Sequence, residues 1–217
     1  MKKSFFYFLP FFLLVMGGFV ACEEVEEAGK YDNWQARNEA FIDSLAQKVK
    51  ATNKYVATEA ELQALEEGEL FAIKDVYAST NKNPQYIYCK KIEKLDSYEN
   101  ARRPLYTESV TAYYYGTLIT GDKFDGNFNG YSATDQGFLD KDDADKAPTD
   151  FDSPTNKTIS SDVLSGRKTA FQYMYIGERW MIYLPWQSAY GSSGKDAVLG
   201  YSALAFDMQL ESVVDED

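Results

Sequence analysis

The fold of this chain is indicated most clearly by residues 163–191, VLSGRKTAFQYMYIGERWMIYLPWQSAYG, and by residues 202–210, SALAFDMQL. The apolar run 180–184 has the composition of a buried strand and stops at Pro185, which lacks a backbone donor for the ladder. The second segment indicates another strand, and residues 166–175 are compatible with a short helix. We therefore expect two strands packed around one helix.

A second informative block lies upstream, at residues 110–118, VTAYYYGTL, and 121–125, GDKFD. The first run predicts a strand, in which alternate side chains point to opposite faces. Tyr114 is therefore expected to point away from its two tyrosine neighbours. Further strands are predicted at 70–73 and 86–92, and this order favours an antiparallel α+β architecture over βαβ units.

Together the two blocks closely resemble the FKBP-type (macrolide-binding immunophilin) peptidyl-prolyl cis-trans isomerases. That family has a strand and turn of the form V-x-V-x-Y-x-G-x-L-x-x-G-x-x-F-D and a last strand of the form L-x-F-D-x-x-L. The resemblance covers about half of the chain, and its blocks stand in the family's order. It implies an FKBP-like antiparallel sheet wrapped around a short helix, and isomerase activity that needs neither metal nor cofactor.

Motif matching carries the family's pocket positions onto this chain. In the family, the position of Tyr190 donates its hydroxyl to the substrate carbonyl, and the position of Asp125 faces the twisting amide. Each aromatic residue taken singly could be ordinary core packing, and Asp125 before Gly126 could be a turn residue. The matched catalytic positions are Tyr114, Phe124, Asp125, Tyr190 and Phe206, and the substrate-binding positions are Val163, Leu164, Val198 and Arg167.

Prolyl isomerisation suits such a pocket because the barrier to rotation is about 18–20 kcal/mol and no bond is broken. As the amide twists, its nitrogen becomes more amine-like and its carbonyl less polar. A dry aromatic cup favours the twisted form over the planar, well-hydrated one, which is differential binding of the transition state.

Arg167 departs from the family pattern. In the family, this position holds the tryptophan that forms the pocket floor. A cationic side chain there would either leave the pocket for solvent or bring charge into the proline cup. Both outcomes imply weakened catalysis, and Arg167→Trp would then raise activity. Trp180 and Trp186 could fill the floor, although neither stands at the matching position.

The N-terminus predicts a lipoprotein signal peptide at residues 1–21, with Lys2 and Lys3 before an apolar run and Cys22 after it. A single membrane span is the alternative, but the run is short for the roughly 20 residues that spanning requires. Cys22 is then the lipidated residue that anchors the protein to a membrane. We expect a Bacteroidetes-like cell-envelope lipoprotein, on the periplasmic face or surface of the outer membrane.

Composition excludes several function classes. The formal net charge of −12 becomes −14 if Lys2 and Lys3 are removed, which disfavours nucleic-acid binding. The absence of histidine excludes histidine bases and histidine metal ligands. If Cys22 is lipidated, Cys89 has no partner for an intramolecular disulfide. The fold must then depend on its apolar core.

The chain is organised as an acidic tether with a helical extension at 22–69 and an FKBP-like domain at 70–214. One face of the helix predicted at 34–49 is apolar and is expected to pack on the domain. An acidic insertion at about 126–162 lacks the glycine and glutamate of a calcium-binding EF-hand loop in every register, which favours a solvated flap. The apolar face consists of Trp34, Phe41, Ile42, Leu45 and Val49.

The sequence thus predicts a peptidyl-prolyl cis-trans isomerase and folding factor that acts on proline-containing polypeptides in the cell envelope. A catalytically weakened FKBP-like binding or chaperone module is the main alternative. A lipoprotein that captures glycans through exposed tyrosine and tryptophan residues is a third hypothesis.

Overall fold

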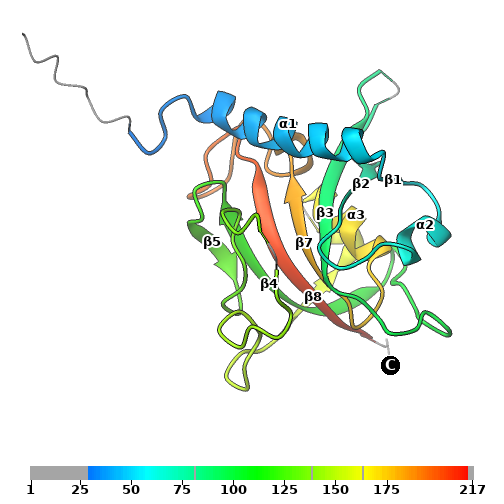
Figure 1. Cartoon of the computed structure of the whole chain (residues 1–217). Helices are drawn as coiled ribbons and strands as arrows, with labels where there is room; N and C mark the ends of the chain where they lie inside the picture. Colours follow the sequence, from blue (N-terminus) through cyan, green and yellow to red (C-terminus); the bar gives the residue numbers. More distant parts are fainter. Residues whose placement is uncertain (1–28, 81, 138, 163, 215–217) are drawn as a thin grey trace, which may run out of the picture. The chain divides into compact units, whose positions relative to one another are not determined.

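One mixed sheet frames the structure (Figure 1). The computed structural model describes residues 29–80, 82–137, 139–162 and 164–214. Contacts divide the chain into two units, Met1–Asp32 and Asn33–Asp217, and the fold below is that of the second unit. Cys22 and Val163 lie outside the described residues, so what was predicted for them stays a prediction.

The described strands follow the order β1-β2-β3-β7-β8-β4-β5, and β6 also pairs with β4. Neighbouring strands are antiparallel except β1 and β2, which run parallel. This architecture confirms the predicted α+β class. The strands are β1 (Tyr55–Val56), β2 (Leu70–Asp75), β3 (Gln85–Glu93), β4 (Ser109–Leu118), β5 (Lys123–Gly126), β6 (Thr155–Thr158), β7 (Arg179–Leu184) and β8 (Leu204–Val214).

The strands predicted at 110–118 and 180–184 are confirmed as β4 and β7. β8 begins at Leu204, two residues later than predicted. The reason is that the Ala203 N–H donates to the side chain of Asn38 at 2.8 Å instead of joining the ladder. This contact ties the start of β8 to helix α1.

Helix α3 (Ser165–Tyr173) confirms the short helix predicted at 166–175. It lies close against the sheet because Gly166 has no side chain. A Cβ at that position would stand 2.5 Å from Leu184 Cδ2 and 3.0 Å from Ile87 Cγ2. The glycine therefore sets how near the helix comes to the strands.

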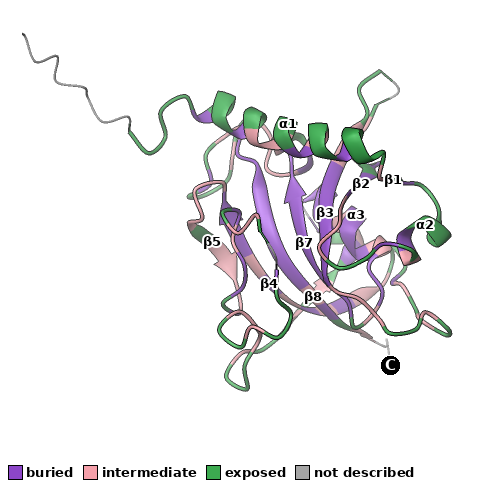
Figure 2. Ribbon diagram, in the orientation of Figure 1, coloured by how far each residue is buried: buried purple, intermediate pink, exposed green. Residues whose placement is uncertain are grey.

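Both faces of the sheet are covered, as the buried strands in Figure 2 show. We call them the α3 face and the α1 face, after the helix that packs on each. The apolar cluster of the α3 face includes Phe71, Cys89, Ala170, Phe171, Trp180, Ile182, Leu184, Phe206 and Met208. The cluster of the α1 face includes Leu45, Val49, Ala72, Tyr88, Tyr131, Ala133, Met181, Tyr183 and Ala205.

Helix α1 (Trp34–Thr52) packs through the predicted apolar face. Leu45 and Val49 are buried in the cluster of the α1 face, and the ring of Phe41 meets that of Tyr183 at 5.9 Å. The short helix α2 (Glu59–Gln63) begins with a capping box of Thr58 and Glu61. Since β1 of this extension also joins the sheet, the predicted domain boundary at residue 70 does not separate two packing units.

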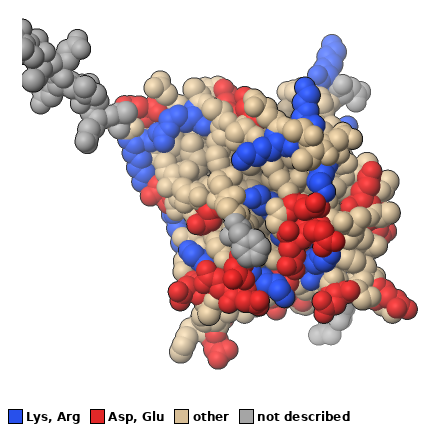
Figure 3. Space-filling view, in the orientation of Figure 1, with Lys and Arg blue, Asp and Glu red and all other residues tan. Residues whose placement is uncertain are grey.

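The acidic insertion at 126–162 is only partly a solvated flap, which corrects the sequence-based expectation. Five of its apolar side chains are buried: Phe128, Tyr131, Ala133, Leu139 and Ile159. The Ala133 N–H also donates to the Thr117 hydroxyl at 2.9 Å. Figure 3 shows acidic side chains gathered over the lower part of the face in view. The insertion is thus an acidic loop that also packs on the sheet, because Tyr131, Ala133 and Leu139 join the cluster of the α1 face.

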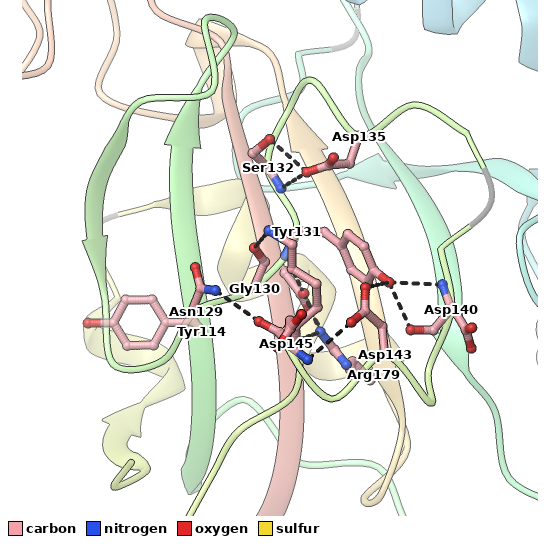
Figure 4. A network of polar contacts seen from close by, with 12 residues as sticks. Tyr114, Asn129, Gly130, Tyr131, Ser132, Asp135, Asp140, Asp143, Asp145 and Arg179 are labelled. Atoms are coloured by element: carbon pink, nitrogen blue, oxygen red, sulfur yellow. Dashed lines mark hydrogen bonds and ion pairs between the residues drawn. The ribbon is translucent and has the colours of Figure 1, made fainter. Parts of the chain in front are cut away.

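A buried ion pair anchors the insertion (Figure 4). Arg179 binds Asp207 through Nε at 2.9 Å and Nη2 at 2.6 Å. Asp207 accepts the N–H of Tyr131 at 2.9 Å, and Arg179 donates to the carbonyl of Lys146. The Tyr131 hydroxyl donates to the carbonyl of Asp140 at 2.9 Å. Arg179 on β7 and Asp207 on β8 thereby bind the insertion at Lys146 and Tyr131.

The aspartates of the insertion cap local turns. Asp140 accepts the N–H of Asp142, and Asp143 accepts that of Asp145, each at 3.0 Å. No group of three or more potential metal-ligating side chains occurs among the residues that the structure describes. The hydrogen bonds accepted by Asp140 and Asp143 stabilise the turns of the loop.

Candidate active site

The alternation of β4 places Tyr114 on the α3 face, as the sequence predicts. Tyr114 is buried in the cluster of that face. Its neighbours Tyr113 and Tyr115 point to the other side, where their rings meet the edge of Phe128 at 6.2 Å and 6.4 Å. Only the central tyrosine of the three therefore reaches the candidate pocket.

Two phenylalanines form an aromatic corner beside Tyr114. The rings of Phe124 on β5 and Phe206 on β8 meet edge to face, with centroids 5.5 Å apart. Gly116 between them allows this contact, because a Cβ there would stand 2.7 Å from Phe206 Cε1 and 3.0 Å from Phe124 Cζ. The strand glycine thus leaves room for the two rings.

Asp125 faces the same corner from β5. Its Oδ1 accepts the Tyr114 hydroxyl at 3.2 Å and the N–H of Gly126 at 2.8 Å. Burial, reinforced by the charge of Asp125, raises the pKa of Tyr114 to about 12. Asp125 therefore binds a turn amide and also orients Tyr114, and its predicted role toward the substrate amide stays a prediction.

Arg167 does not leave the site for solvent: its charge lies against the rings of Tyr114 and Phe206. The residue is only 6% exposed. Its guanidinium lies 5.5 Å from the Tyr114 ring centroid and 5.3 Å from that of Phe206. It binds Asp162 through Nε at 2.5 Å and Nη2 at 2.9 Å. An ion-paired guanidinium thus stands at the motif position of the family's tryptophan.

Asp162 was not identified from the sequence, where it was one aspartate of an acidic loop. Its side chain is 1% exposed, and its Oδ1 also accepts the N–H of Leu164 at 3.0 Å. Burial alone would lower the pKa of Arg167, but the hydrogen bonds that the guanidinium donates to the Asp162 carboxylate, together with the charge of that carboxylate, raise it. The requirement that a buried cation be paired was the signal for such a residue.

Tyr190 lies on the loop between β7 and β8, half-buried against the cluster of the α3 face. Burial raises the pKa of Tyr190; the charge of Arg167 opposes this shift, and Asp125 adds to it. Tyr190 therefore lies within electrostatic reach of both residues. Its hydroxyl makes no hydrogen bond to any residue in the described part of the chain. A free hydroxyl is what a substrate carbonyl requires.

Two further predicted residues line the same apolar cluster. Leu164 precedes α3 and is fully buried, and Val198 is buried at 5% exposure. Neither tryptophan considered for the floor shows a ring contact with the corner residues: Trp180 packs on Phe71, and Trp186 on Tyr201. We call the group Tyr114, Phe124, Asp125, Arg167, Tyr190 and Phe206 the candidate cup.

Two solved structures are similar to this chain at low sequence identity. A peptidyl-prolyl cis-trans isomerase from Pseudomonas syringae pv. tomato is 17% identical, with a TM-score of 0.49 over 87% of this chain and 99% of that one. FkpA from Escherichia coli is 19% identical, with a TM-score of 0.49 over 85% of this chain and 62% of that one.

Two curated proteins are similar in sequence. The FKBP-type peptidyl-prolyl cis-trans isomerase FkpA of Aeromonas hydrophila is 26% identical over 220 residues, which cover 92% of this chain and 73% of that protein. The macrophage infectivity potentiator of Trypanosoma cruzi is 30% identical over 115 residues. This match covers 52% of this chain and 47% of that protein.

The family comparison covers the part of the chain that holds the candidate cup. The family described as FKBP-type peptidyl-prolyl cis-trans isomerase matches residues 100–211, just over half of the chain. The matched region runs from the segment before β4 to β8 and includes the insertion and α3. The chain therefore belongs to the FKBP-type peptidyl-prolyl cis-trans isomerases.

Proposed function

We propose that this protein accelerates cis–trans isomerisation of X–Pro bonds in exported polypeptides, and that the candidate cup is its active site. The observation that carries this proposal is that three aromatic side chains, Tyr114, Phe124 and Phe206, belong to the same apolar cluster against which Tyr190 packs, whose hydroxyl bonds no described residue. The family comparison favours the isomerase over the weakened binding module.

The cup is suited to the chemistry because the reaction needs positioning and desolvation rather than a nucleophile. The aromatic walls replace water around the proline ring, and removal of water favours the less polar twisted amide. The hydroxyl of Tyr190 holds the substrate carbonyl. Burial keeps the hydroxyls of Tyr114 and Tyr190 protonated, since it raises the pKa of both.

Tyr190→Phe tests the role of the free hydroxyl. We expect kcat/KM on a short X–Pro peptide to fall roughly 2- to 10-fold, which corresponds to loss of one net hydrogen bond of about 0.5–1.5 kcal/mol. Exchange spectroscopy on the peptide measures the rate. Tyr86→Phe is the matched control, because Tyr86 lies on β3 and its ring packs on Tyr55 at 5.4 Å. Equal rates for wild type and Tyr190→Phe would contradict the role.

We propose further that the protein is a lipoprotein of the cell envelope, anchored at Cys22. This proposal rests on the basic and apolar residues that precede Cys22. No helix in the described part of the chain has the length and hydropathy that a membrane span requires. The outer membrane, on its periplasmic face or its surface, is the proposed location, and exported polypeptides with proline are the proposed clients.

Cys22→Ser tests the anchor. The native protein is expected in the membrane fraction with an acylated N-terminal Cys22 by mass spectrometry, and the variant in the aqueous fraction. Cys89→Ala is the control, because Cys89 is fully buried in β3 and cannot be the acylated residue. Retention of residues 1–21 in the native protein, or membrane association of Cys22→Ser, would refute the proposal.

A further inference from the structure

One donor of the candidate cup has no partner among the residues that the structure describes. The Nε and Nη2 atoms of Arg167 bind Asp162, but Nη1 is buried and makes no hydrogen bond to any of them. A buried donor left unpaired costs about 1–3 kcal/mol, so folds rarely retain one without a reason. An unpaired guanidinium nitrogen beside the rings of Tyr114 and Phe206 points to an acceptor on the ligand.

The guanidinium is held in a defined position. Asp162 binds two of its nitrogens, which fixes the plane of the group. Asp162 is itself fixed, because its carboxylate accepts the N–H of Leu164 and its own N–H donates to the carbonyl of Ile159 at 3.2 Å. The backbone before α3 therefore sets where Nη1 points.

A prolyl bond offers two acceptors, and they change in opposite directions during the reaction. The carbonyl oxygen accepts best when the amide is planar, because resonance gives it negative charge. The nitrogen accepts only when the amide twists, because its lone pair then leaves the resonance. A donor placed at the nitrogen therefore binds the transition state more tightly than the ground state, which lowers the barrier.

We propose that Arg167 is a catalytic residue that donates an Nη1–H hydrogen bond to the prolyl nitrogen of the twisted amide, and that Asp162 is its positioning residue. This inference rests on the proposed function. No proton is transferred and no bond is broken. Because Nη1 is enclosed, the peptide must displace a neighbouring side chain as it enters. Tyr190 is suited to this movement, since its hydroxyl is bonded to no described residue.

This catalytic role for Arg167 is the opposite of the weakening that the sequence led us to expect. There, Arg167 in place of tryptophan implied weak catalysis, and Arg167→Trp was expected to raise activity. In the structure, Arg167→Trp would remove the only ion-pair partner that the described residues give to the buried Asp162. We now expect that variant to lose both stability and rate.

The test compares two substrates and a neutralised pair. The substrates are one X–Pro peptide and its 4,4-difluoroproline analogue, whose fluorines withdraw electrons from the ring nitrogen and weaken it as an acceptor. The double variant Asp162→Asn/Arg167→Met removes donor and carboxylate together, so that no buried charge is left unpaired. Circular dichroism and thermal unfolding establish that it folds. Rates are expressed relative to the uncatalysed rate of each peptide.

We expect kcat on the proline peptide to fall roughly 10- to 100-fold in the double variant, as for loss of a hydrogen bond from a charged donor. The wild-type acceleration should be smaller for the fluorinated peptide, and this difference should disappear in the double variant. Asp162→Asn alone should lose part of kcat and keep the difference, because the donor remains but is less well held.

Lys168→Met is the control on the same helix, because its Nζ lies 5.3 Å from the Tyr77 ring, outside the cup. It should match wild type on both peptides. A folded double variant with wild-type kcat, or with undiminished sensitivity to fluorination, would overturn the role of Arg167 and leave the isomerase intact. A wild-type protein that accelerates neither peptide would overturn the proposed function and this inference with it.

Discussion

Glu178→Ala is expected to lower the free energy of unfolding by about 3–5 kcal/mol, the typical cost of removing one partner from a buried ion pair. Both side chains of the pair are fully buried, and Lys91 Nζ lies 2.8 Å from Glu178 Oε1. Burial lowers the pKa of Lys91, and Glu178 opposes this shift. Glu178 also accepts the Tyr98 hydroxyl at 2.6 Å, the N–H of Tyr175 at 3.0 Å and the Trp180 indole at 3.1 Å.

Urea unfolding measures this loss, and Lys91→Met is the matched comparison. Lys91→Met should cost less, because Glu178 keeps its other donors, whereas Glu178→Ala leaves a buried ammonium and three other groups without their acceptor. The double variant Lys91→Met/Glu178→Gln should recover much of the stability, since it leaves no charge unpaired. A loss below about 1 kcal/mol for Glu178→Ala would show that the pair does not hold β3 to β7.

Arg179→Met is expected to cost a similar 3–5 kcal/mol, because it leaves the buried carboxylate of Asp207 without its cation. It also removes the hydrogen bond to the carbonyl of Lys146 that holds the insertion. Burial already raises the pKa of Asp207, which Arg179 opposes. Loss of Arg179 should raise this pKa further and loosen the insertion, as amide hydrogen exchange of Tyr131 would report.

The pH dependence of the free energy of unfolding gives an independent check on the role of Arg179. A carboxyl group whose pKa is raised by folding contributes stability that is present at low pH and lost as the pH rises through the folded-state pKa. The deficit of Arg179→Met relative to wild type should therefore shrink between about pH 7 and about pH 4. Arg102→Met is the control, because its pair with Glu108 is exposed and such pairs contribute within about 1 kcal/mol. A deficit that grows on acidification would contradict this account.

The local pattern of apolar residues was sufficient to predict the main strands and helices of the fold. The alternation of 110–118 predicted that Tyr114 would point away from its two tyrosine neighbours, because side chains alternate along any strand, and the structure places it on the α3 face. The apolar face of α1 followed from helical spacing in the same way. Motif order then predicted the aromatic corner of Phe124 and Phe206, which the structure brings to 5.5 Å.

The pairing of buried charges was decided only by the tertiary structure. Arg179 meets Asp207 across the register of β7 and β8, 28 residues apart in sequence, and Lys91 meets Glu178 across 87 residues. Local periodicity gives the face on which a side chain lies, but no information on which distant charge will be opposite.

The same reason explains why the sequence identified Arg167 at the cup and not Asp162. Arg167 stood at a motif position, whereas Asp162 was one of several aspartates in a loop of unknown path. Only the folded chain shows which carboxylate reaches a cation that has been removed from water. The pairing affects stability because the site is buried. An unpaired charge costs several kcal/mol in a dry site and almost nothing in a solvated loop.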